Sequence, residues 1–285
     1  MLPSTAMTTS SSPHDIAAPG DPGPQRALAF PGLRTVRVGG VPITAISRRD
    51  WAQLLVAAAP RRRGTGTPYF LTSANGNVLS RYARSAEFRA LMDLADAIDA
   101  DGQPIVIASQ LLTRTPIPER CATTDFFHDV CRAASATGAS IYMLGATEEI
   151  NRLAVEATRR LYPALRIAGA RHGYFSPAEE ADVVAAINAV GPDIVWIGLG
   201  VPREQAFIAA NRARLVNTGA LKTCGGLFDF LAGRNSRAPQ WMRDHALEWL
   251  YRLVREPRRL FWRYLTTNVH CLWLLLARTA DLPGR

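Results

Sequence analysis

Lysine is almost absent from this chain. Lys222 is the only lysine among 33 basic side chains, so arginine carries nearly all of the positive charge. The net charge of +9 favours anionic partners, which are nucleic acids, acidic lipid headgroups or phosphorylated small molecules. Genomic codon bias explains an excess of arginine equally well. Composition therefore does not distinguish among these partners. The positions of the arginines along the chain have to be used instead.

Cysteine is the second scarce residue. The four cysteines include no CxxC pair, and no histidine stands at metal-ligand spacing from any of them. This argues against a structural zinc site, and a chain of 285 residues does not need a disulfide framework to fold. Reduced thiols, as in a cytosolic protein, and no metal or other cofactor are expected.

Long apolar runs are also missing. No segment reaches the ~18 uncharged apolar residues of a spanning helix, and the closest approach is the stretch 269–277. Residues 1–30 lack the basic start and apolar stretch of a signal peptide. We therefore expect a cytoplasmic protein. Any association with the cell membrane should be peripheral and at its inner face.

Three regions differ in composition. Residues 1–32 are rich in Ser, Thr, Pro and Gly, which predicts a disordered arm because such a segment buries too little apolar surface to offset chain entropy. Residues 33–235 follow as the α/β domain. Residues 236–285 are predicted to form a basic, amphipathic, helical appendage that associates with membrane.

Within the central region, apolar segments typical of strands alternate with segments of helical periodicity. This alternation predicts an α/β fold, a Rossmann-like and mostly parallel sheet flanked by helices. Strands are expected at 33–38, 69–72, 97–100, 140–144, 165–168, 193–200 and 220–224, and helices at 48–59, 77–90, 105–112, 125–137, 147–161, 178–190 and 203–215.

Polar or glycine-rich turns follow many of these strands. In parallel sheets, ligands bind beyond the carboxyl ends of the strands, so such turns should form one site. The expected site residues of this kind are Ser73, Asn75, Asp101, Gly145, Gly198, Gly200, Gly225 and Gly226.

From Gln240 onward the pattern is helical only. Two apolar stripes flanked by arginines are separated by Pro257, and basic amphipathic helices with Trp and Tyr suit a membrane surface. An ordinary helix pair packed on the sheet, with solvated arginines, explains the same pattern. The stripes are Leu247, Leu250, Tyr251 and Val254, then Leu260, Phe261, Tyr264 and Leu265.

Several short motifs occur together in a characteristic order: Asp101-Gly102, Leu144-Gly145, Tyr162-Pro163, Gly173-Tyr174-Phe175, Pro192-Asp193, the segments 198–202 and 225–233, Arg237-Ala238-Pro239 and the segment 247–253. Through these motifs the chain resembles the WecG/TagA/CpsF glycosyltransferases (glycosyltransferase family 26) from about Val36 to Tyr264.

The resemblance implies an enzyme that transfers a sugar from a UDP-sugar donor to a polyprenyl-diphosphate-linked acceptor, with inversion and without a metal. In several members the sugar is N-acetylmannosamine or its uronic acid, and the products are cell-surface polymers or exopolysaccharides. An inverting transfer needs a base for the acceptor hydroxyl. The resemblance assigns this role to Asp101, with Asn75 and Ser73 orienting a sugar. A turn or N-cap role for Asp101 and a cap role for Asn75 are the alternatives.

The departing UDP gains negative charge, which arginine can stabilise through bidentate contacts. The resemblance points to Arg120, and to Arg237, Arg252 and Arg255 of the C-terminal segment. Solvated surface arginines are the alternative interpretation.

Glu204 and Gln205 stand in the reverse of the usual family order. Both are candidate substrate-binding residues. A carboxylate repels a diphosphate, so we expect Glu204 to face a sugar hydroxyl or the ribose.

Three other functions compete with sugar transfer. An NAD-dependent oxidoreductase would use Gly198 and Gly200, but Arg203 occupies the position of the third glycine of that fingerprint. A non-enzymatic peripheral membrane protein would keep the fold alone. Nucleic-acid binding needs basic residues interleaved with exposed aromatics along a groove, whereas here they cluster in one terminal segment, so no nucleic-acid partner is expected.

Overall fold

The computed structural model describes Phe30, residues 33–235, Pro239, Met242, residues 248–255 and residues 257–282. Side chains at 248, 249, 252, 255 and 257–266 are outside this description. Arg237 and Leu247 lie outside the described residues, as does most of the predicted N-terminal arm.

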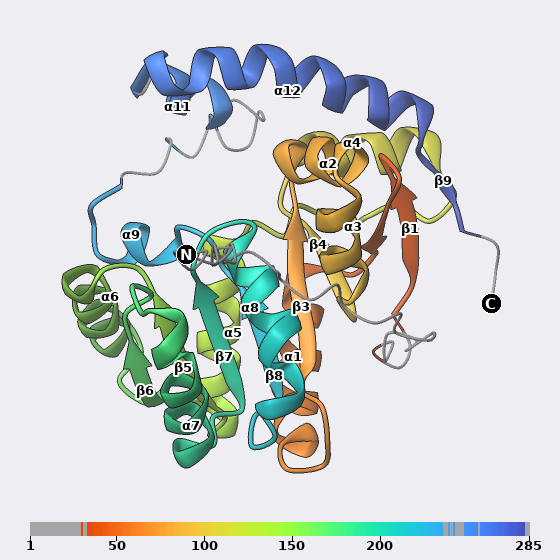
Figure 1. Ribbon diagram of the computed structural model, residues 1–285. Coiled ribbons are helices and arrows are strands. Elements are labelled where there is room, and N and C mark those ends of the chain that lie inside the picture. The colour runs from red at the N-terminus through yellow and green to blue at the C-terminus, as the bar shows by residue number, and fades with distance from the viewer. Residues whose placement is uncertain are drawn as a thin grey trace, which may run out of the picture.

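A six-stranded parallel sheet forms the centre of the molecule, in the order β4-β3-β8-β7-β5-β6 (Figure 1). The predicted α/β architecture is therefore confirmed. Because every strand runs in the same direction, all the carboxyl ends meet at one edge. The strands are β3 (Tyr69–Ala74), β4 (Ala97–Ala100), β5 (Ser140–Gly145), β6 (Arg166–Arg171), β7 (Ile194–Gly198) and β8 (Ala220–Thr223).

Helices cover both faces of this sheet, and strand alternation divides the apolar side chains between them. Trp196 packs with Trp51 and Phe126 in one core cluster, whereas its neighbour Val195 packs with Ile187 in another. The helices between strands are α1 (Arg48–Arg62), α2 (Gly76–Arg84), α3 (Ala86–Asp93), α4 (Gln103–Leu112), α5 (Thr123–Thr137), α6 (Glu148–Leu161), α7 (Glu180–Val190), α8 (Arg203–Asn211) and α9 (Leu227–Leu231), with 3₁₀ turns η1 (Pro177–Glu179) and η2 (Arg212–Arg214).

One predicted helix is two helices. The periodicity predicted a single helix over 77–90, but α2 ends at Arg84 and α3 begins at Ala86. Ser85 lies between them in an extended conformation, and its side chain accepts a hydrogen bond from the Phe88 amide. Serine at an N-cap favours a new helix over continuation of the old one, which explains the break.

The C-terminal region returns to the start of the ordered chain. Helices α11 (Glu248–Arg255) and α12 (Pro257–Ala277) follow α9, and α12 runs across α2 (Figure 1). The final strand β9 (Ala280–Asp281) pairs antiparallel with β1 (Thr35–Val38), which also pairs with β2 (Val41–Thr44). The expectation of helix alone after Gln240 was therefore wrong at β9.

Phe30 falls within the predicted arm but belongs to the core. Its side chain is 1% exposed and stacks on Tyr69, with ring centroids 3.9 Å apart. Aromatic packing of this kind fixes Phe30 against α1 and β3. Among the described residues, no helix is long and apolar enough to cross a bilayer.

Candidate functional site

The residues predicted from strand ends do lie at one edge of the sheet. β3 and β4 are neighbours, and the Asp101 amide donates to the Ala74 carbonyl at 2.8 Å, which places Asp101 beside the Ser73–Asn75 segment. β8, β7 and β5 follow in order across the sheet and bring Gly225, Gly198 and Gly145 to the same edge.

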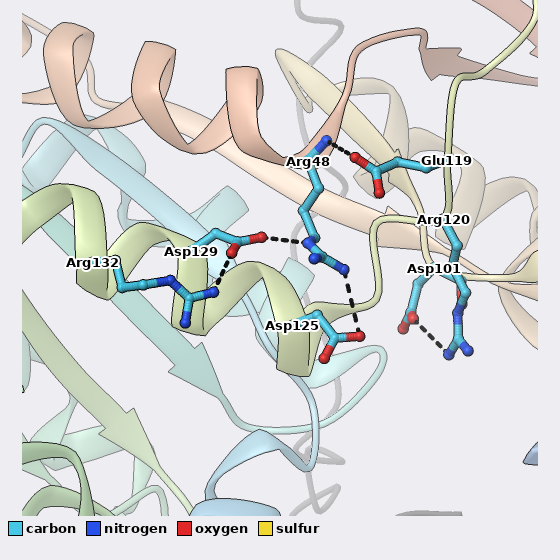
Figure 2. Close-up of polar contacts among 7 residues, drawn as sticks. All are labelled: Arg48, Asp101, Glu119, Arg120, Asp125, Asp129 and Arg132. Atoms are coloured by element: carbon cyan, nitrogen blue, oxygen red, sulfur yellow. Dashed lines mark hydrogen bonds and ion pairs between the residues drawn. The ribbon is translucent and has the colours of Figure 1, made fainter. Parts of the chain in front are cut away.

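Asp101 is partly open to solvent and paired with arginine. Its carboxylate Oδ1 lies 3.4 Å from Arg120 Nη2, and Arg120 Nε donates to the Asp101 carbonyl at 3.0 Å (Figure 2). The two side chains are 23% and 20% exposed. Arg120 thus holds the carboxylate in place while part of its surface stays exposed.

The segment that carries Arg120 is anchored from α1. The Arg48 amide donates to Glu119 at 3.0 Å, and the Arg48 guanidinium contacts Asp129 and Asp125 on α5 (Figure 2). Asp129 also pairs with Arg132 at 2.6 Å. Through these contacts α1 holds both Glu119, just before Arg120, and helix α5, just after it. This limits how far the Arg120 guanidinium can move from Asp101.

The only lysine of the chain lies beneath the site, and sequence reasoning assigned it no role. Lys222 is fully buried, and its ammonium group lies 2.8 Å from Asp99 Oδ2 and 2.6 Å from Ser73 Oγ. Trp51 Nε1 donates to the other Asp99 oxygen at 2.6 Å. β3 separates β4 from β8, so a long side chain on β8 can reach across to Asp99 while touching Ser73.

Thr123 connects Ser73 to Asp101. Its hydroxyl lies 3.3 Å from Ser73 Oγ and donates over a long 3.5 Å to Asp101 Oδ2. Because an ammonium group only donates, the Ser73 oxygen accepts from Lys222 and its own proton points onward. Lys222, Ser73 and Thr123 therefore present donors one after another toward the carboxylate.

Asn75 caps a helix. Its Oδ1 accepts from the amides of Asn77 and Val78 at 3.1 and 3.2 Å, as the alternative interpretation foresaw. The amide nitrogen of the same side chain makes no hydrogen bond within the described part of the chain. Capping thus fixes the side chain beside Asp101 and leaves a donor for a sugar hydroxyl. The orienting role stays a prediction.

Two of the predicted glycines are needed for packing between strand ends. A Cβ on Gly145 would lie 2.3 Å from the Gly198 carbonyl oxygen, and one on Gly198 would lie 2.9 Å from the Gly225 oxygen. Gly200 and Gly225 have φ of +79° and +52° with open space where a Cβ would stand. Gly226 precedes α9 as its N-cap. Contact of these turns with a diphosphate stays a prediction.

Glu204 and Gln205 are buried, at 2% and 1% exposure. Glu204 accepts from the Gly225 amide at 3.0 Å, and Gln205 Nε2 donates to Thr72 at 3.4 Å. Burial raises the pKa of Glu204 to about 7, against the opposing effects of the Gly225 amide and Lys222. The carboxyl group thus holds the β8–α9 turn against α8, and its predicted contact with a sugar or ribose stays a prediction.

Glu204 should make stability depend on pH. Its folded pKa lies above the usual 4.5, so the folded state holds the proton between those values and stability falls as pH rises from about 4.5 to 7. The difference corresponds to about 3 kcal/mol. Glu204→Gln should remove most of this dependence and be more stable than the wild type at pH 8. Urea unfolding at pH 5 and 8 tests this. An unchanged pH dependence would contradict it.

Three predicted arginines belong to the C-terminal segment. Arg237 lies outside the described residues, and Arg252 and Arg255 belong to α11 with side chains outside the description. Of the predicted stripe on that helix, Val254 is 73% exposed and Leu250 is 37% exposed. The predicted role of these arginines in holding UDP stays a prediction.

Comparison with known proteins shows the family to which the chain belongs. Residues 36–283 match the model of the glycosyl transferase WecG/TagA/CpsF family. The chain is similar to an N-acetylglucosaminyldiphosphoundecaprenol N-acetyl-beta-D-mannosaminyltransferase of Bacillus spizizenii, with 30% identity over 194 residues, 68% of this chain and 73% of the relative. The Staphylococcus aureus (strain MW2) protein of the same name is 28% identical over 191 residues, 67% of this chain and 74% of the relative. The chain therefore belongs to the glycosyl transferase WecG/TagA/CpsF family.

Proposed function

We propose that this glycosyltransferase moves a sugar of the N-acetylmannosamine type from a UDP-sugar donor to an acceptor sugar linked to polyprenyl diphosphate, in the synthesis of a cell-surface polymer or exopolysaccharide. The names of the relatives support the acceptor class and the sugar. The observation that carries the proposal is the partly open Asp101 carboxylate at the sheet edge, held by Arg120 and contacted by the Thr123 hydroxyl.

The proposed reaction is a single displacement. The acceptor hydroxyl oxygen forms a bond to the anomeric carbon while the bond from that carbon to the UDP oxygen breaks, which inverts the configuration. The acceptor proton passes to the Asp101 carboxylate, and the bonding electrons leave with UDP. General base catalysis of this kind contributes about 10²–10⁴-fold to a rate.

The negative charge that develops on UDP has to be balanced without a metal in this proposal. Arg120 is the described arginine nearest to the base, 3.4 Å from its carboxylate. Arg237, Arg252 and Arg255 are proposed to add positive charge from the C-terminal segment. Open backbone at Gly200 and Gly225 supplies room for a diphosphate to approach amide groups.

The acceptor is a lipid, so the proposed location is the inner face of the cytoplasmic membrane. The exposed apolar side chains of the C-terminal helices support a peripheral position, since Val254, Leu272 and Leu276 are 73%, 59% and 67% exposed. Basic, amphipathic helices bind at the plane of anionic membranes.

The proposal is tested with a panel of UDP-sugars and a polyprenyl-diphosphate-N-acetylglucosamine analogue, assayed with EDTA present. We expect acceptor-dependent release of UDP from one donor, UDP-N-acetylmannosamine or a close relative. Titration with UDP and with NAD provides the control, and we expect binding of UDP alone. NAD binding without UDP binding, or transfer that stops in EDTA, would contradict the proposal.

A further inference from the structure

A second arginine-lined site lies on the side of the molecule where the chain closes on itself. A cavity of about 400 Å³ is bounded by the β1–β2 turn, the α2–α3 junction and the segment after α12. The C-terminal segment is clamped there, because the Gly40 amide donates to the Arg278 carbonyl at 2.8 Å and the Gly39 amide donates to Thr279 Oγ1 at 3.1 Å. None of the residues assigned above to sugar transfer lines this cavity.

Three guanidinium groups line the cavity, from three separate parts of the chain: Arg37, Arg89 and Arg278. Arg89 is held by the carbonyls at the end of α2, with Nε 3.1 Å from Tyr82 O, and lies over the Tyr82 ring. Arg278 lies over Trp273, with its guanidinium carbon 5.6 Å from the ring centroid. These contacts orient the groups and leave further N–H donors for a ligand.

The positive charge of this cavity is not neutralised by ion pairs. Within the described residues, no carboxylate lies within 4 Å of the guanidinium nitrogens of Arg37, Arg89 or Arg278. Asp93 is the nearby acidic group, and it accepts the Tyr82 hydroxyl at 2.6 Å. Oriented arginines without carboxylate partners favour a phosphate-type anion.

The last turns of α12, residues 271–276, are apolar both toward the core and toward solvent. Cys271, Leu274 and Leu275 pack into the core under α12, whereas the opposite side exposes Leu272 by 59%, Trp273 by 52% and Leu276 by 67%. A helix segment that is apolar all round suits a protein core or lipid, and here one side packs in the core while the other is exposed. Leu276 immediately precedes the first cavity residue of this segment, Ala277, so the apolar side and the arginines adjoin.

Helix α4 extends the same surface. Asp281 accepts hydrogen bonds at 3.0–3.1 Å from the amides of Arg114 and Thr115, which ties the end of α4 to the C-terminal segment. Just before that end, Leu111 is 77% exposed and Leu112 is 44% exposed. Exposed apolar side chains thus lie at the end of α4 as well as on α12, and the C-terminal segment that lines the cavity is tied to both helices.

We propose that this cavity binds the phosphate of an anionic phospholipid headgroup while the exposed side of α12 lies in the lipid interface. Arg37, Arg89 and Arg278 supply the charge, Trp273 lies at the depth of the headgroups, and Leu272 and Leu276 reach toward the acyl chains. This deepens the membrane association proposed above by naming its site. The proposed headgroup site is tested by vesicle binding alone. The binding test can therefore fail while the proposed transfer reaction holds, and the transfer reaction can fail while the binding site holds.

The test compares co-sedimentation with vesicles of phosphatidylcholine alone and vesicles that also contain phosphatidylglycerol. The full-length double variant Arg89→Gln/Arg278→Gln should lose about 30-fold in binding to the anionic vesicles, since each basic residue near anionic lipid contributes about fivefold. Arg159→Gln/Arg160→Gln, with two exposed arginines of α6 removed, changes the net charge equally and should bind within about twofold of the wild type.

Further measurements distinguish lipid binding from binding of a free anion and from dimer formation. Leu272→Ser/Leu276→Ser should weaken binding to both kinds of vesicle and leave the melting temperature near that of the wild type, because both side chains are exposed. Titration with inorganic phosphate measures a free-anion site. Equal losses in the α6 and cavity variants, tight phosphate binding without any preference for anionic vesicles, or burial of α12 in a stable dimer would each overturn the proposal.

Discussion

Replacing Asp101 with asparagine is expected to reduce turnover by about 10²–10⁴-fold while donor affinity stays within a few-fold of the wild type. Asparagine keeps the size of the side chain and can still meet Arg120, which now lies 3.4 Å from the carboxylate. It cannot accept the acceptor proton. Steady-state transfer rates and UDP-sugar titration of the same preparations separate the two effects.

Asp182→Asn is the matched control, because Asp182 is exposed on α7 and the same charge is removed away from the site. Its turnover should equal that of the wild type. If Asp101→Asn turned over as fast as the wild type, Asp101 would not be the general base. If Asp101→Asn and Asp182→Asn lost the same activity, the loss would come from the change in net charge.

Replacing Lys222 with methionine is expected to destabilise the fold by about 3–5 kcal/mol, because it leaves the Asp99 charge buried without its partner. Asp99 is 2% exposed and Lys222 is 0% exposed. The double variant Lys222→Met/Asp99→Leu removes both charges and should recover most of this loss. Urea unfolding of the two variants and the wild type measures it. Equal stability of the single variant and the wild type would show that the pair contributes nothing.

Activity of the double variant then shows whether Lys222 serves only the fold. Ser73 loses the donor that now lies 2.6 Å from its oxygen, so the row of donors toward Asp101 is interrupted. We expect the refolded double variant to keep its KM for the donor and to lose about tenfold in kcat, in line with loss of one charge-assisted hydrogen bond. Full recovery of kcat would assign Lys222 a purely structural role.

The sheet and the edge that collects the candidate site residues could be predicted because their signals are local. Apolar segments of strand length, each ending in a polar or glycine turn, mark the parallel strands, and the topology collects those ends. Asp101, Ser73 and Asn75 were found in this way, and the structure places them side by side. The capping role of Asn75 was also foreseeable from its place before a helix.

The interior of the site could not be predicted, because its partners are distant in sequence. Lys222 contacts Asp99 and Ser73 because the sheet places β3 between β4 and β8. Nothing in the local sequence shows which of several strands will be adjacent. The single lysine in an arginine-rich chain was the available signal. Its position inside an apolar strand could have marked it as a buried charge that needs a partner.

Two other departures from the predicted elements have separate causes. β9 has two residues and exists through its pairing with β1, which no periodicity can reveal. The break between α2 and α3 did have a local signal, since Ser85 stands three residues before the amide that it caps. Helical periodicity continued through the break and outweighed that signal.

The pH dependence of sugar transfer to the acceptor tests the central claim most directly. In the wild type, kcat/KM for the acceptor should fall on the acid side with the slope of one titrating group, because protonation removes the base. In Asp101→Asn that acid limb should vanish, and the small residual rate should rise with pH as hydroxide takes over the proton. An acid limb that persists unchanged in Asp101→Asn would show that another group accepts the proton, and would contradict the account.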